Sequence, residues 1–174
     1  MSKTYNNLKL AFTGEAQANL KYLAFAQRAA DEYKEGIYRL FMAVAEGETI
    51  HALKHLRHMK EVKSTKENLQ EALSGEIREV KSMYPQMIQK AREEGEKGAE
   101  VTLSHAMEVE RVHRELLQEA IDNLEHFPVQ EYFICPACGY IAAKEAPDKC
   151  TVCGAVKDVF FRAGSEKEAG IANL

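Results

Sequence analysis

The chain has 174 residues, of which 45% are hydrophobic and 29% are charged, and its formal net charge at pH 7 is -4. This composition is typical of a globular protein with one ordinary core and room for a small second unit. The charges are of mixed sign throughout, so the sequence lacks the basic stripe that nucleic-acid or anionic-membrane binding requires. We therefore expect neither nucleic acid nor a membrane as a partner.

The beginning of the chain predicts a cytoplasmic location. Residues 1–5 lead directly into a polar helical pattern, without the apolar segment of a secretion signal. No segment approaches the about 18 consecutive apolar residues that a membrane-spanning helix needs. All four cysteines lie between 135 and 153 in two Cys-x-x-Cys pairs, which in a reducing compartment favour a metal site over disulfides.

Apolar residues recur at intervals of three and four in four segments, which predicts four amphipathic helices. We expect the first at about 6–33, the second from near Ile37 to about 62, and the fourth at about 99–124.

The third predicted helix follows a polar connector in which Ser64 or Thr65 can act as the N-cap. Pro85 must kink or shorten this helix, because proline lacks the N–H that would bond to the carbonyl four residues earlier.

Each predicted helix carries charged or imidazole side chains on its apolar face, where leucine is usual. In chain order they are Glu15; Glu48 and His51; Glu76 and Glu79; Glu110 and His113. Residues three apart share one face of a helix, so each Glu-x-x-His motif presents an oxygen and a nitrogen ligand to the same point.

Some of these residues have a second interpretation. Taken alone, Glu15 also fits a glutamate at the edge of the core that reaches water. His55 lies four residues after His51, and we interpret it as a packed histidine beside the site, with a further ligand as the alternative. Surface glutamates are predicted off the apolar faces, at Glu46, Glu108 and Glu119.

Five carboxylates in an apolar core need compensating positive charge, because an isolated buried charge costs several kcal/mol. Two metal ions supply it. A Glu from each of two helices with a Glu-x-x-His motif from each of the other two is the ligand pattern of ferritin-like di-metal bundles. Oxygen-rich ligation with one imidazole per metal suits iron or manganese better than zinc.

The last part of the chain, 129–174, predicts a second unit of about 40 residues, too small to fold by apolar burial alone. Short strand-like runs surround two Cys-x-x-Cys-Gly motifs, which predict one tetrahedral metal site from Cys135, Cys138, Cys150 and Cys153. Structural zinc and redox iron both fit four thiolates. The segment 165–174 carries no pattern and is a candidate for a disordered tail.

With these motifs the sequence resembles the rubrerythrins over nearly its whole length. The resemblance rests on Phe12-Thr13-Gly14-Glu15, Glu48-x-x-His51-Ala52, Gly75-Glu76-x-x-Glu79 before Met83-Tyr84-Pro85, Glu110-x-x-His113 and the C-terminal knuckles. Ferritins lack the rubredoxin-like unit, and isolated rubredoxins lack the bundle. The resemblance implies a mainly α fold, with a ferritin-like four-helix bundle in 1–128 and a small rubredoxin-like metal-knuckle β domain in 129–174.

The resemblance also implies an activity. In rubrerythrins a non-haem di-iron site reduces hydrogen peroxide to water, and an iron held by four thiolates passes electrons to it. By position, Glu48 and Glu110 would bridge the two irons, Glu15 would be terminal on one iron, and Glu76 and His113 would be terminal on the other.

Further roles follow from the same likeness. Glu79 and His51 match a redox toggle, in which the first iron shifts between carboxylate and imidazole. Tyr22 and Tyr84 match tyrosines that orient ligand carboxylates, with ordinary core tyrosines as the alternative.

The implied partners are hydrogen peroxide and an electron-donor protein, either rubredoxin or an NAD(P)H-linked reductase, because the chain has no dinucleotide-binding fingerprint. Family members usually form homodimers in which the rubredoxin-like unit of one chain serves the bundle of the other, so we expect a homodimer or a higher homo-oligomer. The alternative function is an iron-binding ferroxidase whose four cysteines hold structural zinc.

Overall fold

In residues 2–164, which the computed structural model describes, the chain forms two compact units, 2–63 and 64–164. The tail predicted at 165–174 lies outside the described residues. None of the helices in the described part is long and apolar enough to cross a bilayer.

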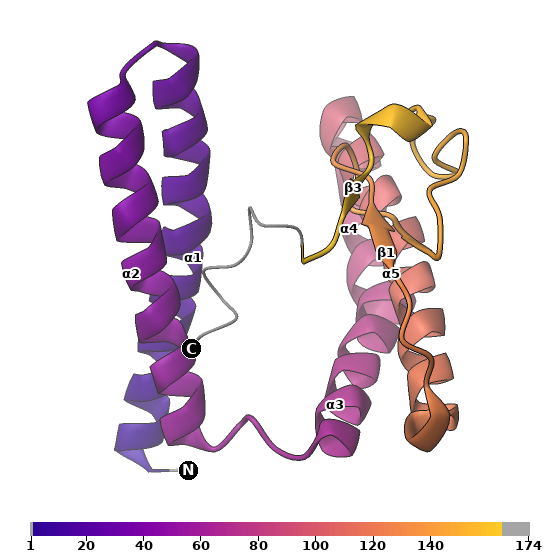
Figure 1. Cartoon of the computed structure of the whole chain (residues 1–174), viewed down its shortest axis with the longest axis horizontal. Helices are drawn as coiled ribbons and strands as arrows, with labels where there is room; N and C mark the ends of the chain where they lie inside the picture. The colour runs from indigo at the N-terminus through magenta and orange to yellow at the C-terminus, as the bar shows by residue number, and fades with distance from the viewer. Residues whose placement is uncertain (1, 165–174) are drawn as a thin grey trace. The chain divides into compact units, whose positions relative to one another are not determined.

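The first unit is a pair of antiparallel helices, α1 (Lys3–Asp31) and α2 (Glu35–Met59), drawn in indigo and purple in Figure 1. The buried residues along their contact are mostly alanines, Ala26 and Ala29 on α1 and Ala45 and Ala52 on α2. Such small side chains let the two helix backbones approach closely. At the open end of the pair, the Tyr5 hydroxyl donates a hydrogen bond to the Glu61 carboxylate.

The predicted limits of the second helix are wrong by two or three residues at each end. Tyr33 adopts a left-handed φ of +57°, so the turn comes before Gly36, and α2 has already begun at Glu35. At the other end Lys60 takes a left-handed φ of +59° and ends the helix at Met59. Val62, which the apolar pattern includes in the helix, lies in the connector and is exposed.

The second unit begins with α3 (Thr65–Arg78), which has a complete capping box. The Ser64 hydroxyl accepts from the Glu67 backbone N–H at 3.4 Å, and the Glu67 carboxylate accepts from the Ser64 N–H at 3.2 Å. Ser64 is therefore the N-cap, as one of the two sequence alternatives predicts.

A π-helical turn, η1 (Glu79–Met83), separates α3 from α4 (Tyr84–Glu94). In this turn the Tyr84 backbone N–H donates to the Glu79 carbonyl five residues earlier. Pro85 follows directly, and the wider turn accommodates the ring that would collide with a carbonyl in a regular helix. The predicted interruption at Pro85 thus takes the form of a π segment that contains Glu79.

The longest helix of this unit is α5 (Lys97–Asp122), which follows a left-handed Gly95 and packs against α3 and α4. A single 3-10 turn, η2 (Leu124–His126), leads into the C-terminal part of the chain.

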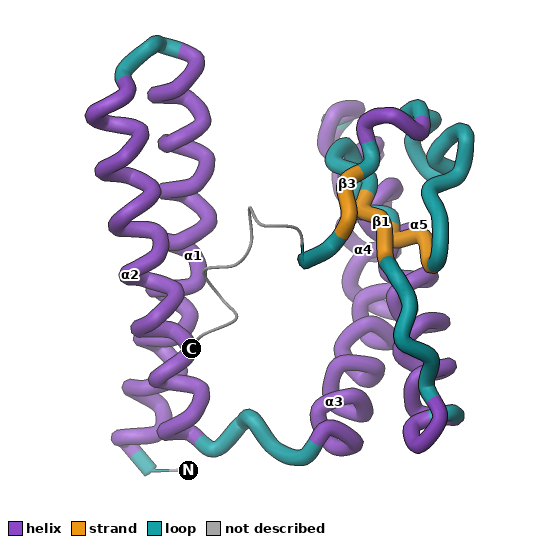
Figure 2. Tube along the Cα trace, viewed as in Figure 1, coloured by secondary structure: helices purple, strands orange, loops and turns teal. Residues whose placement is uncertain are grey.

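The C-terminal part holds a small antiparallel sheet of β1 (Tyr132–Ile134), β2 (Ile141–Ala143) and β3 (Phe161–Arg162), with the 3-10 turn η3 (Lys157–Val159) before β3. The strand order is β2-β1-β3, and Phe133 pairs with both Ala142 and Arg162. Figure 2 shows these strands in orange, joined by long teal loops. Within this unit β2 packs against α5.

Candidate metal centres

The helix pair holds one group of potential ligands, which we call the first triad: Glu15 from α1 with Glu48 and His51 from α2. One ligand atom from each residue lies within 4.8 Å of the others. His51 Nδ1 is 3.3 Å from Glu48 Oε2, but 59% of the His51 side chain remains exposed. The imidazole is therefore held by one neighbour and has space to move.

The two carboxyl groups of the first triad share a hydrogen bond. This bond raises the pKa of Glu15 and, together with the bond to His51, lowers the pKa of Glu48. One proton between two acids is the usual consequence of placing like charges together. His55 lies close enough for its charge to lower the pKa of Glu15, which agrees with a histidine beside the site.

Asn19 braces the two helices one turn from Glu15, a role that the sequence analysis missed. Its amide donates to the Ala45 carbonyl and to the Thr49 hydroxyl, both at 2.7 Å. Asn19 lies four residues after Glu15 on the same helix face, but its partners on the other helix cannot be located from sequence spacing.

The second unit holds a matching group, the second triad, of Glu76 from α3 with Glu110 and His113 from α5. His113 Nδ1 is 2.7 Å from Glu110 Oε2 and 3.8 Å from Glu76 Oε1. Among the described residues, Glu76 Oε2 and His113 Nε2 are buried side-chain atoms without a hydrogen-bond partner. Buried polar atoms rarely remain unpaired, and a cation between them would satisfy both.

Burial and the neighbouring carboxylates of Glu110 and Glu79 raise the pKa of Glu76 to about 7. Burial also raises the pKa of Tyr84, with smaller contributions from Glu110, Glu79 and Glu76. Glu79 and Tyr84 therefore both lie within electrostatic reach of the second triad, although neither belongs to it.

Tyr22 lies in an aromatic cluster of the helix pair. Its ring centroid is 6.2 Å from that of Phe41 and 6.3 Å from that of Phe25. Its proposed role in orienting a ligand carboxylate remains a prediction.

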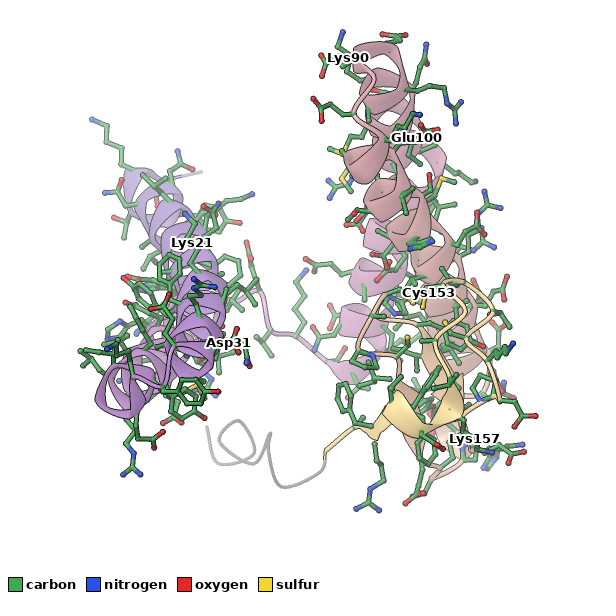
Figure 3. The ribbon with its side chains drawn as sticks, turned by 90° about the horizontal axis from the view of Figure 1, so that it is seen from above. Lys21, Asp31, Lys90, Glu100, Cys153 and Lys157 are labelled. Carbon is green, nitrogen blue, oxygen red and sulfur yellow. The ribbon has the colours of Figure 1, made fainter. Side chains whose placement is uncertain are left out.

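Four cysteines form the third group, in loops around the small sheet; Cys153 is labelled in Figure 3. The Cys135 and Cys153 sulfurs are 3.6 Å apart, as are those of Cys138 and Cys150. A disulfide would bring sulfurs to about 2.05 Å, whereas four metal–sulfur bonds of about 2.3 Å in a tetrahedron place them about 3.8 Å apart. The spacing fits one tetrahedral metal.

The backbone around these cysteines folds into two similar knuckles. Gly139 N–H donates to the Cys135 carbonyl and Gly154 N–H to the Cys150 carbonyl, both at 2.9 Å. The two glycines have φ of +84° and +77°, which explains why glycine follows each pair.

The pKa values of the Cys150 and Cys138 thiols are shifted in opposite directions by their surroundings. Although burial opposes ionisation, backbone N–H groups of Cys153 and Val152 lower the pKa of Cys150 to about 7. Burial instead raises the pKa of Cys138. A bound cation would favour the thiolate at both positions.

A family model described as Rubrerythrin matches residues 6–121, which hold both triads. The chain belongs to the rubrerythrin family. A second model, described as the rubredoxin-like domain of rubrerythrin, matches residues 133–161 and covers all four cysteines.

Known members of the rubrerythrin family match most of the chain. Rubrerythrin-2 of Clostridium acetobutylicum is 36% identical, covering 90% of this chain and 95% of the relative. Nigerythrin of Nitratidesulfovibrio vulgaris is 35% identical, covering 92% of this chain and 86% of the relative. A solved structure of nigerythrin in its fully reduced, all-ferrous state matches with a TM-score of 0.57 at 35% identity, covering 93% of this chain and 87% of that chain.

These matches confirm the predicted fold class, a mainly α chain with ferritin-like helices followed by a small rubredoxin-like unit. They also agree with the two predicted kinds of metal site, a carboxylate and histidine di-metal site and a four-cysteine site. Members of the rubrerythrin family are oxidoreductases, which sets the class of chemistry for this chain.

Proposed function

We propose that the chain is a non-haem di-iron peroxidase, which reduces hydrogen peroxide to water with electrons relayed through an iron held by the four cysteines. The observation that carries this proposal is the presence, in one rubrerythrin-family chain, of two triads of the same composition and a tetrahedral thiolate site. Two electrons and two protons convert one peroxide molecule into two waters.

The two triads complete each other in this proposal. Each offers two carboxylates and one imidazole, and two metal ions need the oxygen donors of both. The helix pair also leaves large apolar side chains open to water, including Leu20 at 68%, Leu40 at 57% and Ile37 at 48% exposure. Covering them would bring the first triad against a partner surface.

Each residue of the site has a separate role in this proposal. Glu48 and Glu110 would be shared by the two metals, Glu15 would hold one of them, and Glu76 and His113 would hold the other. The partly exposed His51 and the π-helical Glu79 would exchange as ligands of the first metal. Tyr84 would orient a ligand carboxylate, as its proximity to the second triad allows.

Iron held at the paired site would supply the electrons for cleavage of the oxygen–oxygen bond, and the protein residues would tune that chemistry. A ferric ion favours an anionic oxygen ligand such as Glu79, and a ferrous ion accepts a neutral nitrogen such as that of His51. The His51 side chain is 59% exposed and its Nδ1 lies 3.3 Å from Glu48 Oε2, and this exposure supports such an exchange.

Electrons come from NAD(P)H through a separate donor protein, either rubredoxin or a reductase, in the cytoplasm. The protein acts as a homodimer or higher homo-oligomer, with the domains bounded at 1–128 and 129–174.

The decisive experiment uses anaerobically reduced protein whose iron content has been measured. A four-thiolate iron site is red when oxidised and bleaches on reduction, so stoichiometric peroxide should restore the colour. Peroxide that fails to reoxidise the fully iron-loaded protein would show that the peroxidase assignment is wrong.

The spacing of the sulfurs fits zinc as well as iron, and this favours a second candidate function. In that case the chain binds and oxidises iron, and the four cysteines only stabilise the small unit. Protein purified from cells grown with ample iron would then be colourless, and ferrous ions would be oxidised by dioxygen without any change at the cysteines.

A further inference from the structure

The connector between α2 and α3 is short. Because α2 ends at Met59 and α3 begins at Thr65, only the five residues 60–64 join the helix pair to the second unit. Even when fully extended, this segment carries the chain from Met59 to Thr65 over at most about 21 Å.

A ferritin-like bundle needs a longer connection at this point. Such bundles contain one long crossover, which lets their second and third helices run parallel. The other two connections between the bundle helices, 32–34 and 95–96, are tight turns. The crossover would therefore have to be formed by 60–64.

The positions of two ligands set the length that this crossover must have. Glu48 lies eleven residues before the end of α2, and Glu76 lies eleven residues after the start of α3. At 1.5 Å per residue, each ligand is about 16 Å from its end of the connector. If α2 and α3 ran parallel with both ligands at one level, the connector would have to span about 33 Å, which exceeds its extended length.

The helix pair leaves apolar side chains open to water on the face that carries the first triad. Val44 lies four residues before Glu48 and is 37% exposed, and Leu23 lies eight residues after Glu15 and is 39% exposed. Residues at these spacings share one face of a helix. This face therefore has the character of a surface that a partner covers.

The second unit carries the complementary half of the site. Its triad repeats the composition of the first, with two carboxylates and one imidazole. Among the described residues, Glu76 Oε2 and His113 Nε2 are buried and lack a hydrogen-bond partner. A metal pair shared with another first triad would satisfy both atoms.

We infer that the di-metal site is built between two copies of the chain, with α1 and α2 of one copy supplying the first triad and α3 and α5 of the other copy supplying the second. Two-fold symmetry then gives a closed dimer with two such sites. The inference rests on the paired metal site of the proposed function, but not on its reaction with peroxide.

The competing arrangement is a bundle that closes within one chain. Five residues are enough for α3 to turn back beside α2, but this gives the up-down-up-down topology with short loops, and not the ferritin-like one. In that case one chain would hold both metals by itself. Exchange of helices between copies keeps the ferritin-like topology without any long connector.

Complementation between two metal-site variants tests the inference. One copy carries Glu48→Ala, which damages the first triad, and the other carries Glu110→Ala, which damages the second. The two chains are co-expressed with different affinity tags, and the species that holds both tags is purified. Its total iron is measured by elemental analysis, and the four-thiolate iron, known from its visible absorbance, is subtracted to give the paired iron.

An exchanged dimer of this composition contains one site with both substitutions and one site with neither. We therefore expect it to hold about half of the paired iron of the wild-type dimer, whereas each variant alone should hold little. If each chain closed its own bundle, every site would carry one substitution. Paired iron no higher than in the single variants would overturn the inference.

The matched control combines Glu76→Ala with Glu110→Ala, because both changes fall in the second unit and leave no complete site in an exchanged dimer. This pair should show no recovery of paired iron, and recovery would contradict the inference. Glu15→Ala with His113→Ala has one change in each unit and should recover as the first pair does. It replaces the first pair if helical circular dichroism shows that Glu48→Ala does not fold.

The mass of the iron-loaded wild type gives an independent measurement. Light scattering after size exclusion should give at least twice the chain mass of 19.6 kDa. A single-chain species that holds paired iron would overturn the inference, because one chain would then complete its own site. Wild type without any paired iron would contradict the proposed function as well, whereas bound iron that peroxide fails to reoxidise would contradict only that function.

Discussion

At the scale of single residues, Glu48 of α2 and Glu79 of the π-helical turn should differ in their roles. Glu48 bonds to both Glu15 and His51, so Glu48→Ala removes the centre of the first triad. Glu79 lies outside both triads, and Glu79→Ala should keep the metals but slow turnover about tenfold or more. Iron per chain and the rate of peroxide-driven reoxidation measure the two effects.

A matched control for these variants is Glu108→Ala, on the outer face of α5, where the side chain is half exposed. It should change neither iron content nor rate. Equal and mild effects of Glu48→Ala and Glu79→Ala would contradict the assigned roles.

The pKa of Glu76 predicts how the stability of the metal-free protein depends on pH. Its folded-state pKa is about 7, against an ordinary value of 4.5, so between these values the folded protein keeps a proton that the unfolded chain has lost. The free energy of unfolding should therefore fall as pH rises from about 4.5 to about 7. Allowing for solvent screening, we expect a loss of about 1–2 kcal/mol.

Urea unfolding of the metal-free protein at pH 5 and at pH 7.5 measures this loss. Glu76→Gln removes the titrating group, so its stability should fall less over the same range. A variant with the same pH dependence as the wild type would show that another group is responsible. Iron binding should reverse the trend, because the metal competes with the proton at Glu76.

The residues of the two triads could be predicted from the sequence because a charged side chain on an apolar helix face violates the usual pattern. Glu15, Glu48 and Glu110 stand out for this reason, and the structure places them in the two triads. Asn19 was missed because an uncharged amide near a helix face carries no comparable signal. Its function depends on the Thr49 hydroxyl of the other helix, which sequence spacing alone does not locate.

At the scale of elements, the start of α3 depends on one hydroxyl. Ser64→Ala removes the acceptor for the Glu67 N–H and should cost about 1 kcal/mol of stability. Ser74→Ala is the matched control, because Ser74 is exposed within the same helix and only bonds back to the Gln70 carbonyl. A Ser64→Ala cost no larger than that of Ser74→Ala, measured by thermal unfolding, would show that the cap is dispensable.

Helix existence was easier to predict than helix ends or irregular turns. Periodic apolar residues locate all the long helices, and the rule for Pro85 correctly interrupts the third one. The form of that interruption was not predictable, because Pro85 only removes one backbone donor, and the sequence does not show that the Tyr84 N–H then bonds to the Glu79 carbonyl five residues earlier. The positive φ of Tyr33 and Lys60, which sets the ends of α1 and α2, likewise has no glycine to announce it.

At the scale of the whole molecule, the candidate metal sites lie in two kinds of structure. Apolar packing stabilises the helices that hold the two triads, but it is not sufficient to stabilise the small four-cysteine unit. The helices bury apolar side chains where they contact one another, such as Ala26, Ala45 and Ile88, whereas β1, β2 and β3 have two or three residues each. In the small unit the fully buried Cys135 and nearly buried Cys150 take the place of a core. Metal binding at the four thiolates should therefore provide most of the folding free energy of this unit.

Cys153→Ser tests this dependence, because it removes one of four thiolates without altering the helices. We expect loss of the metal and rapid hydrogen exchange at the amides of β1 and β2, while the helical circular dichroism remains close to that of the wild type. Thr151→Ser, an exposed position within the same knuckle, should retain both metal and protection. Slow exchange in metal-free Cys153→Ser would mean that packing against α5 is enough to fold the small unit, and chelation of the wild type should then also leave its strands protected.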